Sequence, residues 1–224
     1  MPHPISAVVF DAYGTLFDVH SVTAECESCF PGAGSQFSQL WRVKQLQYTW
    51  LRSLMGRYCD FEALTRDAAK ATAAALGFLL TERSLGRLMA AYDTLTPFPE
   101  VRQALAGLRG FRRAILSNGS PRMLGAVVRH AQMEELLDRV ISVDEVRIFK
   151  PHPSVYSLAC DAFDVPASQI AFVSSNFWDA SGATSYGFRT FWINRTQSQP
   201  EELGYAPACI VGNLGELASA LAAA

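Results

Sequence analysis

The sequence predicts an α/β protein that is built on a doubly wound parallel sheet and carries an inserted helical cap. Three observations support this prediction. Short apolar runs alternate with helix-like stretches, polar residues follow several of the runs, and helical segments alone occupy the stretch from Val19 to Leu95. Strands that alternate with helices are typical of a parallel, Rossmann-like sheet, whose ligands bind beyond the carboxyl ends of the strands.

Five short runs predict the strands of the sheet. They are rich in apolar and β-branched residues, as expected for strands that are buried on both faces. The runs are Ile5–Phe10, Arg113–Leu116, Val140–Val143, Ile170–Val173 and Thr190–Ile193. We expect Asp11, Ser117, Lys150 and Ser174 to lie just after four of these strands, so that their side chains converge on one crevice.

Helical periodicity dominates the chain between the first and second predicted strands. It predicts helices at Gln36–Leu54, Phe61–Ala75 and Thr81–Leu95. The alanine-rich end, Leu217–Ala224, is predicted to form a terminal helix because alanine has a high helix propensity.

The proline-rich segment Thr96-Pro97-Phe98-Pro99 breaks helix formation and indicates the return to the sheet. We therefore expect residues 1–18 and 97–224 to form the core domain and residues 19–96 to form the cap domain. Because the cap is inserted directly after the loop of the first strand, it is expected to cover the crevice.

The composition narrows the class of partner. The 224 residues carry a formal net charge of -2, so no broad basic surface for nucleic acid is expected. The longest apolar runs are far below the roughly 18 residues that span a bilayer, and no membrane partner is expected. The beginning of the sequence shows no export signal, which favours a cytoplasmic protein that acts on a small molecule.

The cysteines indicate free thiols. There are five, an odd number, at scattered positions. Cys26 and Cys29 form a C-x-x-C pair, but a structural zinc site needs about four ligands and no second pair stands at a useful spacing. We expect no metal site and no cofactor.

Four segments together resemble the motifs of the haloacid dehalogenase (HAD) superfamily. They occur in the order that this superfamily shows, and the resemblance covers essentially the whole chain. The segments are Asp11-Ala12-Tyr13-Gly14-Thr15-Leu16, Leu116-Ser117-Asn118-Gly119, Lys150-Pro151 and Ser174-Ser175-Asn176-Phe177-Trp178-Asp179. The resemblance implies a HAD-like fold in which Asp11 is a nucleophile. The alternative is that Asp11 only caps a turn and that Lys150 is a surface charge.

Two features favour a dehalogenase over a phosphatase. Phosphatases of this superfamily carry a second aspartate two residues after the nucleophile, as the acid that protonates the leaving group, and here Tyr13 stands at that position. A halide leaves without a proton. Magnesium prefers carboxylate ligands, but only Asp179 is acidic in the segment Ser174–Asp179. A small-metabolite phosphatase and a non-catalytic binding protein remain the alternatives.

The resemblance implies a reaction in two steps. Asp11 displaces halide from a short (S)-2-haloacid to form an ester, and water then hydrolyses this ester to an (R)-2-hydroxy acid. Lys150 is expected to keep Asp11 ionised, and Thr15 to orient it. Thr15 and Ser117 could instead be ordinary helix caps, and Lys150 a solvated surface residue.

The hydrolytic water needs a group that positions or activates it. Asp179 is the candidate for this role, with Ser174 and Asn176 as hydrogen-bond partners. Alternatively, Asp179 holds Lys150 in an ion pair and acts only through it.

The segment Leu40–Arg52 resembles the cap helix of L-2-haloacid dehalogenases, in which an arginine after the tryptophan binds the departing halide. That residue is Arg42, and a solvated surface arginine is the alternative. A glutamine commonly follows this arginine in the family, whereas Val43 does here, which predicts a more apolar pocket. Relatives of this type are often homodimers, so a homodimer is expected.

The remaining substrate contacts follow from the same resemblance and from the predicted turns. Ser117 and nearby backbone amides are expected to bind the substrate carboxylate. Asn118 and Phe61 are expected to complete the halide site. The side chains expected to surround the alkyl chain or otherwise contact the substrate are Tyr13, Leu46, Phe61, Tyr156 and Trp178.

Overall fold

A computed structural model of the chain describes residues 4–223. Its centre is a parallel sheet with the strand order β3-β2-β1-β4-β5-β6. The strands are β1 (Ala7–Phe10), β2 (Arg112–Ser117), β3 (Arg139–Ser142), β4 (Ile170–Ser174), β5 (Arg189–Ile193) and β6 (Cys209–Val211). The sheet and its flanking helices confirm the predicted α/β class.

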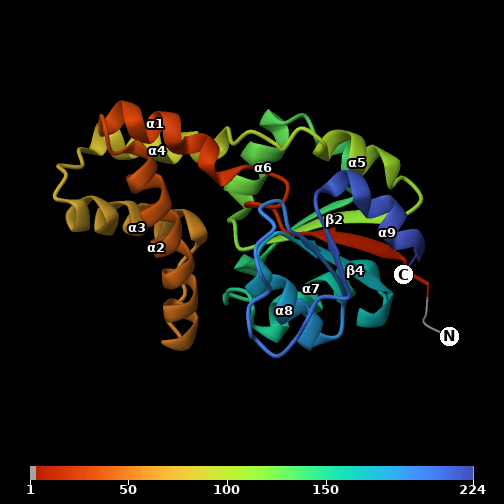
Figure 1. Ribbon diagram of the computed structural model, residues 1–224. Helices are drawn as coiled ribbons and strands as arrows, with labels where there is room; N and C mark the ends of the chain where they lie inside the picture. The colour runs from red at the N-terminus through yellow and green to blue at the C-terminus, as the bar shows by residue number, and fades with distance from the viewer. Residues whose placement is uncertain (1–3, 224) are drawn as a thin grey trace.

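Helices cover both faces of the sheet, as a doubly wound topology requires. In Figure 1, α5, α6 and α9 lie on one face and α7 and α8 on the other. These helices are α5 (Val101–Gly107), α6 (Pro121–His130), α7 (Pro153–Phe163), α8 (Phe177–Tyr186) and α9 (Leu217–Ala223). The last helix matches the predicted alanine-rich one, apart from Ala224, which lies outside the described residues.

Four further helices lie together beside the sheet, on the side of the cap (Figure 1). They are α1 (Thr23–Cys29), α2 (Gly34–Leu54), α3 (Phe61–Leu76) and α4 (Glu82–Asp93). Helix α3 begins where Asp60 accepts a hydrogen bond from the backbone N of Ala63 (2.8 Å) and ends at Gly77, whose φ of 73° stops the helix.

The chain enters and leaves this helical layer through two segments that lie side by side. The backbone N of Asp18 donates to the carbonyl of Thr96 (2.8 Å), and Phe17 forms an antiparallel bridge with Pro97. This pairing supports the proposal that residues 1–18 and 97–224 form one domain and residues 19–96 another.

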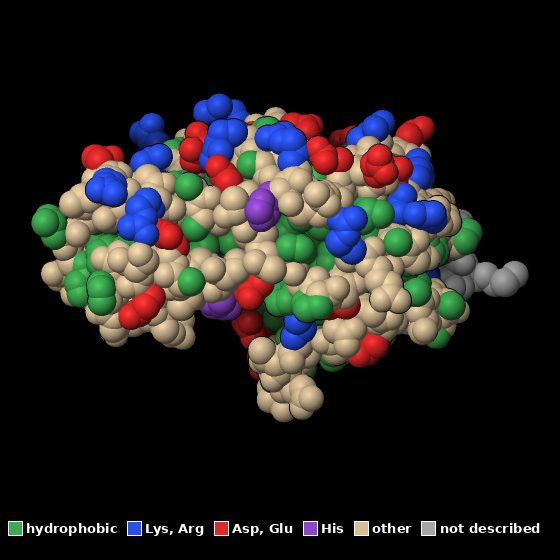
Figure 2. Space-filling view, turned by 90° about the horizontal axis from the view of Figure 1, so that it is seen from above, with side chains coloured by type: hydrophobic (Ala, Val, Ile, Leu, Met, Phe, Trp, Pro, Cys, Tyr) green, Lys and Arg blue, Asp and Glu red, His purple; other side chains and the backbone are tan. Residues whose placement is uncertain are grey.

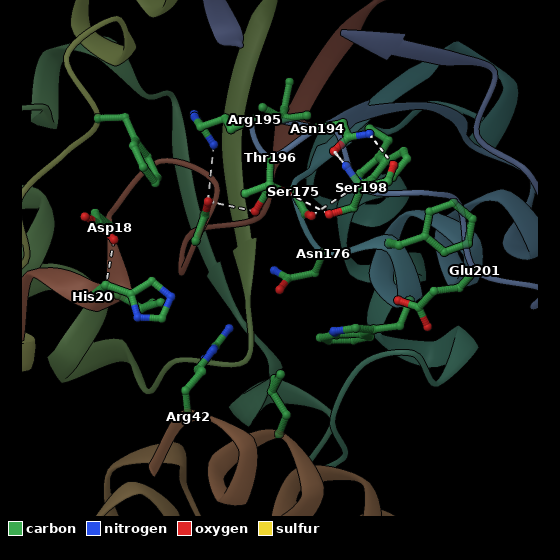
Figure 3. Close-up of a pocket in the computed structure, with 18 of the residues that line it drawn as sticks. Asp18, His20, Arg42, Ser175, Asn176, Asn194, Arg195, Thr196, Ser198 and Glu201 are labelled. Carbon is green, nitrogen blue, oxygen red and sulfur yellow. Dashed lines mark hydrogen bonds between the residues drawn. The ribbon is translucent and has the colours of Figure 1, made fainter. Parts of the chain in front are cut away.

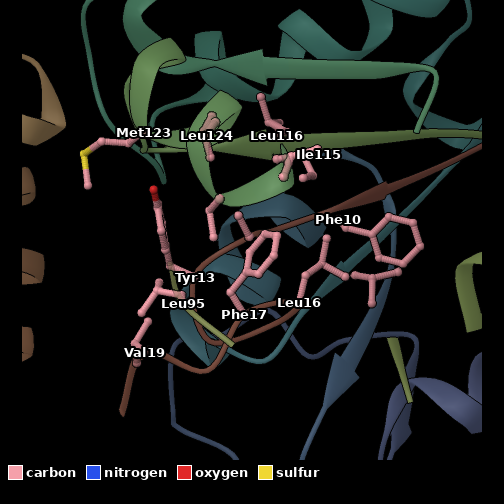
Figure 4. Close-up of a cluster of buried hydrophobic side chains, with 14 of the residues drawn as sticks. Phe10, Tyr13, Leu16, Phe17, Val19, Leu95, Ile115, Leu116, Met123 and Leu124 are labelled. Atoms are coloured by element: carbon pink, nitrogen blue, oxygen red, sulfur yellow. The ribbon is translucent and has the colours of Figure 1, made fainter. Parts of the chain in front are cut away.

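The apolar core begins at the sheet and continues to the entrance of the cap. All four residues of β1 are fully buried, since helices cover both faces of the sheet. Figure 4 shows Phe10, Leu16 and Ile115 near the sheet and Val19 and Leu95 at the crossing into the helical layer. The core therefore fixes the loop after β1 from both sides.

The structure corrects three details of the predicted elements. Strand β3 is shifted by one residue, because Val143 already begins a short 3-10 turn. Helix α4 begins after Thr81, which caps it, and ends before Leu95. The edge strand β6 was not predicted, since it has only three residues and Ile210 is exposed.

Acidic and basic side chains are intermixed on the face shown in Figure 2. A surface of this kind offers no continuous basic stripe for a nucleic acid on that face. Among the described helices, none has the length and apolar character needed to cross a membrane.

Candidate active site

Asp11 stands directly after β1, at the carboxyl edge of the sheet. Its backbone N donates to the carbonyl of Val173 in β4 (2.9 Å), which fixes where the side chain begins. Oδ1 accepts a hydrogen bond from Nζ of Lys150 (3.1 Å), and Oδ2 accepts one from Nδ2 of Asn176 (2.8 Å). The carboxylate is thus almost completely removed from solvent yet surrounded by donors.

The loop after β1 turns back on itself and brings Thr15 to the same carboxylate. Oγ1 of Thr15 donates to Oδ2 of Asp11 (3.1 Å) and accepts from the backbone N of Ser175 (2.8 Å). Gly14 makes this turn with a φ of 94°, a conformation that side chains with a Cβ rarely adopt. The hydroxyl of Thr15 thus lies against the carboxylate that it is predicted to orient.

Lys150 lies between two carboxylates in the interior. Its Nζ is 3.1 Å from Oδ1 of Asp11 and 2.9 Å from Oδ2 of Asp179, and the side chain is 1% exposed. Burial alone would lower the pKa of Lys150, but the two neighbouring negative charges outweigh burial and raise it. Lys150 therefore remains an ammonium at neutral pH, and its burial excludes the alternative of a solvated surface residue.

The position of Lys150 in the chain differs from the prediction. It does not follow β3 directly but stands at the far end of the loop between β3 and α7. Its backbone N donates to Oδ1 of Asn118 (3.0 Å), which ties this loop to the turn after β2. That hydrogen bond brings the lysine back to the edge of the sheet.

Asp179 is fully buried in the first turn of α8. Oδ2 accepts from Lys150, and Oδ1 accepts from the hydroxyl of Tyr156 (2.8 Å). Burial raises the pKa of Asp179 to about 6, although Lys150 partly opposes this effect. Because both oxygens are occupied, the geometry fits the ion-pair alternative better than a base that faces water.

Tyr156 was expected to contact the substrate, but the structure places it behind Asp179. Its hydroxyl donates to the side chain of Asp179, and the ring is fully buried against Phe172, with the ring centroids 5.7 Å apart. A Cβ on Gly182 would lie 2.7 Å from this hydroxyl, so the glycine makes room for it. Tyr156 therefore reaches Asp11 only through Asp179 and Lys150.

A small cavity lies in front of Asp11, between the sheet and the cap. Its volume is about 10 Å³, roughly that of one water-sized probe. Its walls are Asp11, Tyr13, Arg42, Leu46, Phe61, Ser117, Asn118, Asn176 and Trp178. All nine are residues that the sequence predicts for the site, so three strand ends and two cap helices meet where expected.

The turn after β2 forms the wall of the cavity next to Asp11. Oγ of Ser117 accepts from the backbone N of Gly119 (3.1 Å), and the carbonyl of Gly119 accepts from Ser142 (2.7 Å). The side-chain oxygen of Asn118 accepts from the backbone N of Lys150. The side-chain nitrogen, Nδ2, is therefore the donor of Asn118 that remains for the cavity. Ser174 plays a similar local part after β4, where its Oγ accepts from the backbone N of Asn176 (3.1 Å).

Apolar side chains form the other walls. The ring of Tyr13 stacks on Phe61 with the centroids 5.6 Å apart, and Trp178 packs edge-on against Trp50 at 5.5 Å. Leu46 of α2 also lines the cavity. These apolar walls lower the local dielectric constant, which strengthens a charge interaction beside them.

Arg42 extends from α2 toward the core domain and lines both this cavity and a larger one of about 490 Å³ (Figure 3). Its guanidinium donates to the carbonyl of Tyr13 and to Oε1 of Gln45, and both hydrogen bonds are 3.3 Å long. Within residues 4–223, Arg42 forms no ion pair with a carboxylate. The charge of the guanidinium is therefore available to an anion.

Sequence reasoning missed Arg195, which supports the nucleophile loop from outside. It pairs with Glu100 (2.7 Å), lies 3.7 Å above the ring of Phe98, and donates to the carbonyl of Thr15 (3.0 Å). Figure 3 shows Arg195 on the wall of the larger cavity. Its place directly after β5, at the carboxyl edge of the sheet, is the signal that could have found it.

Comparison with known proteins agrees with this geometry. The family of haloacid dehalogenase-like hydrolases matches residues 5–187. This chain belongs to that family. An (S)-2-haloacid dehalogenase of Pseudomonas sp. (strain YL) is 51% identical over 205 residues, which cover 91% of this chain and 88% of that protein. The haloacetate dehalogenase H-2 of Moraxella sp. (strain B) is 48% identical, over 91% of this chain and 92% of that protein.

Solved structures of haloacid dehalogenase-like hydrolases are equally similar. The crystal structure of one L-2-haloacid dehalogenase has a TM-score of 0.96 and 48% identity, and the match covers 98% of this chain and 100% of that one. The L-2-haloacid dehalogenase of Xanthobacter autotrophicus with chloropropionic acid covalently bound has a TM-score of 0.94 and 41% identity. That match covers 97% of this chain and 98% of the other.

The residues around the nucleophile do not fit the magnesium site of a phosphatase. A magnesium ion needs several oxygen ligands, preferably carboxylates, near the nucleophile. Here an ammonium lies 3.1 Å from Asp11, and the other contacts of the carboxylate are the hydroxyl of Thr15 and the amide of Asn176. The described residues contain no group of three or more His, Cys, Asp or Glu placed to hold a metal ion.

Proposed function

We propose that this haloacid dehalogenase-like hydrolase converts short (S)-2-haloacids into (R)-2-hydroxy acids. One observation carries the proposal. A buried carboxylate, Asp11, is held by three donors and shares a small cavity with the guanidinium of Arg42, which no carboxylate neutralises within the described residues. The names of the most similar relatives support the same reaction.

In the first step, Asp11 attacks the carbon that bears the halogen. The C–O bond of an ester forms, and the carbon–halogen bond breaks as the halide leaves with its electron pair. The hydrogen bonds from Lys150, Thr15 and Asn176 fix the direction of the Asp11 carboxylate, so little reorganisation is needed at the moment of attack. Attack from the face opposite the halogen inverts the configuration.

The leaving halide and the substrate carboxylate bind at different walls of the cavity, which widens to admit a molecule larger than one water. Arg42, with Asn118 and the edge of Phe61, binds the halide as its charge develops. Ser117 and the backbone amides of the following turn bind the carboxylate. The alkyl chain lies among the apolar walls formed by Tyr13, Leu46, Phe61 and Trp178.

In the second step, water adds to the ester carbonyl of Asp11. One proton of the water passes to solvent. The bond between the Asp11 carbonyl carbon and the substrate oxygen breaks, and the other proton of the water passes to this oxygen, which gives the hydroxyl group and restores the carboxylate. The oxygen of Asp11 that did not attack becomes the oxyanion, and it is stabilised by its own donors, which are Lys150 on Oδ1 or Thr15 and Asn176 on Oδ2. We propose that Asp179 contributes through Lys150, whose ammonium it balances, and that Ser174 keeps the turn at Asn176 in place.

Halide release in the presence of EDTA tests this function. With (S)-2-chloropropanoate and purified protein, ion chromatography is expected to show one chloride for each (R)-lactate formed. A phosphatase would instead hydrolyse p-nitrophenyl phosphate in the presence of magnesium, and a binding protein would form no ester at Asp11, as mass spectrometry of quenched protein would show. Failure to release halide from any short 2-haloacid would contradict the proposal.

We also propose that the protein is a cytoplasmic homodimer. All five cysteines are described and none forms a disulfide, as is usual in a reducing compartment. Helix α2 and its end expose four apolar side chains, Val43, Leu51, Leu54 and Met55, with exposed fractions from 45% to 85%. Val43 therefore lies on the surface, and the prediction that it makes the pocket more apolar is wrong. A second copy of the chain could cover the four side chains.

A further inference from the structure

A fully buried glutamine joins three helices of the cap to Arg42. Gln45 stands one turn after Arg42 in α2, where an apolar side chain would be the ordinary choice at a buried position. Its Nε2 donates to Oγ1 of Thr65 in α3 (2.8 Å). Its Oε1 accepts from the hydroxyl of Tyr92 in α4 (3.1 Å) and from Nη1 of Arg42 (3.3 Å).

The hydrogen bonds of Gln45 fix its amide in one orientation. Thr65 accepts from the amide nitrogen, and Tyr92 and Arg42 donate to the amide oxygen. Tyr92 is itself fully buried against Trp41, with the ring centroids 4.9 Å apart. The acceptor that faces Arg42 is therefore held in place by rigid surroundings, unlike an acceptor on the surface.

The acceptor is also neutral. A glutamate at this position could accept hydrogen bonds from Arg42, Tyr92 and the hydroxyl of Thr65, so hydrogen bonding alone does not require an amide. A carboxylate 3.3 Å from the guanidinium at this fully buried position would, however, cancel most of its charge. Gln45 thus directs Arg42 without neutralising it.

We propose that Gln45 is a positioning residue for halide departure, which it assists by holding the guanidinium of Arg42 toward the cavity with its charge intact. This inference rests on the proposed role of Arg42 as the group that binds the halide. If it is correct, the interior of the cap influences the rate at which the carbon–halogen bond breaks but not the rate of ester hydrolysis.

The dependence of ester formation on the leaving group tests this inference. In Gln45→Leu, single-turnover ester formation is expected to slow about tenfold with 2-chloropropanoate but only about threefold with 2-bromopropanoate. Bromide is the better leaving group, so chloride needs more stabilisation as it departs. Ester hydrolysis is expected to be unchanged. Thr49→Val is the matched control, since it removes another side-chain hydrogen bond of α2, from the hydroxyl of Thr49 to the carbonyl of Leu46. It is expected to leave the ratio of the bromide rate to the chloride rate unchanged.

Two further variants keep the test decisive. Gln45→Glu retains the shape and every hydrogen bond, so it folds even if Gln45→Leu does not, and its added charge is expected to raise the same ratio. Arg42→Gln is expected to raise the ratio further. If Arg42→Gln raises it and both Gln45 variants leave it unchanged, the inference about Gln45 is wrong. If Arg42→Gln also leaves it unchanged, Arg42 does not bind the halide, and the inference is overturned together with that part of the proposed function.

Discussion

The chemistry of single residues in this site depends on one ammonium shared by two buried carboxylates. Lys150 contacts Asp11 on one side and Asp179 on the other. Removing one member of such a group leaves an uncompensated buried charge, which typically costs about 3–5 kcal/mol of stability. The nucleophile and its supporting charges therefore form one unit, and their protonation states are linked.

The pH dependence of catalysis should report the protonation of Asp179. Its pKa is raised to about 6 by burial, so below about pH 6 it takes up a proton and no longer balances Lys150. We expect kcat/KM to fall on the acidic side of this value. The hydrogen bond from Tyr156 lowers the pKa of Asp179, so Tyr156→Phe should raise it and move the acidic limb upward by about one pH unit.

A pH–rate profile of both proteins with 2-bromopropanoate measures this shift. The neighbouring Tyr186→Phe is a suitable control, because its hydroxyl contacts the thiol of Cys160 and not Asp179. An acidic limb at the same pH in Tyr156→Phe and in the unchanged protein would contradict the assignment.

At this scale the sequence predicted the walls of the cavity but not every contact behind them. The nine lining residues stand at motif positions that the end of a strand or the face of a helix brings to one place. The roles of Gln45 and Tyr156 depend instead on hydrogen bonds between different helices. Such contacts leave no periodic pattern in the chain, so the packed structure was needed to find them.

Among the elements, the turn that follows β2 is packed most tightly against the site. A Cβ at Gly119 would lie 2.8 Å from Cε2 of Tyr13 and 2.9 Å from Cδ2 of Leu124. Position 119 therefore requires glycine, because the ring of Tyr13, which forms one wall of the cavity, approaches the backbone closely there.

Gly119→Ala is expected to displace the ring of Tyr13 and narrow the cavity. We expect a loss of about 1–3 kcal/mol in the free energy of unfolding, the usual cost of overpacking, together with a raised KM for 2-haloacids. Denaturant unfolding and steady-state kinetics measure the two effects. The control is Gly110→Ala in the turn before β2, where a Cβ would meet nothing within 4 Å. Equal behaviour of the two variants would contradict this account.

Most strands and the long cap helices followed from periodicity, and their ends agree to within about two residues. Lys150 was misplaced relative to β3 because a loop of irregular structure separates the two, and its return to the sheet depends on the hydrogen bond to Asn118. The strand β6 was missed because three residues with one exposed side chain give no alternating pattern.

At the scale of the whole molecule, polar contacts orient the cap on the core. Arg122 of α6 pairs with Glu62 of α3 and with Asp93 of α4 (2.8 Å), and Tyr58 donates to Asp144. Exposed ion pairs contribute only about 0–1 kcal/mol each, so these contacts set the position of the cap more than its stability. The sequence predicted an inserted cap, but not these contacts, because their partners are far apart in the chain.

The proposed homodimer predicts a surface variant with a clear effect. Leu54, at the end of α2, is 85% exposed. Leu54→Glu should place charge in the apolar surface and shift the protein from dimer to monomer in sedimentation equilibrium. Leu79→Glu, at a similarly exposed site (86%) after α3, is the comparison and should remain dimeric. A monomer in the unchanged protein, or a dimer that Leu54→Glu leaves intact, would contradict this interface.

The central claim is that Asp11 itself forms the new bond to carbon. A single turnover in water labelled with ¹⁸O, with the protein in excess over (S)-2-chloropropanoate, tests it most directly. Because the hydroxyl oxygen of the first product comes from the Asp11 carboxylate, we predict unlabelled lactate and one ¹⁸O in the peptide that contains Asp11, both measured by mass spectrometry. Label in the hydroxyl group of the first-turnover lactate, with none in Asp11, would show that water attacks the carbon directly and would contradict the account.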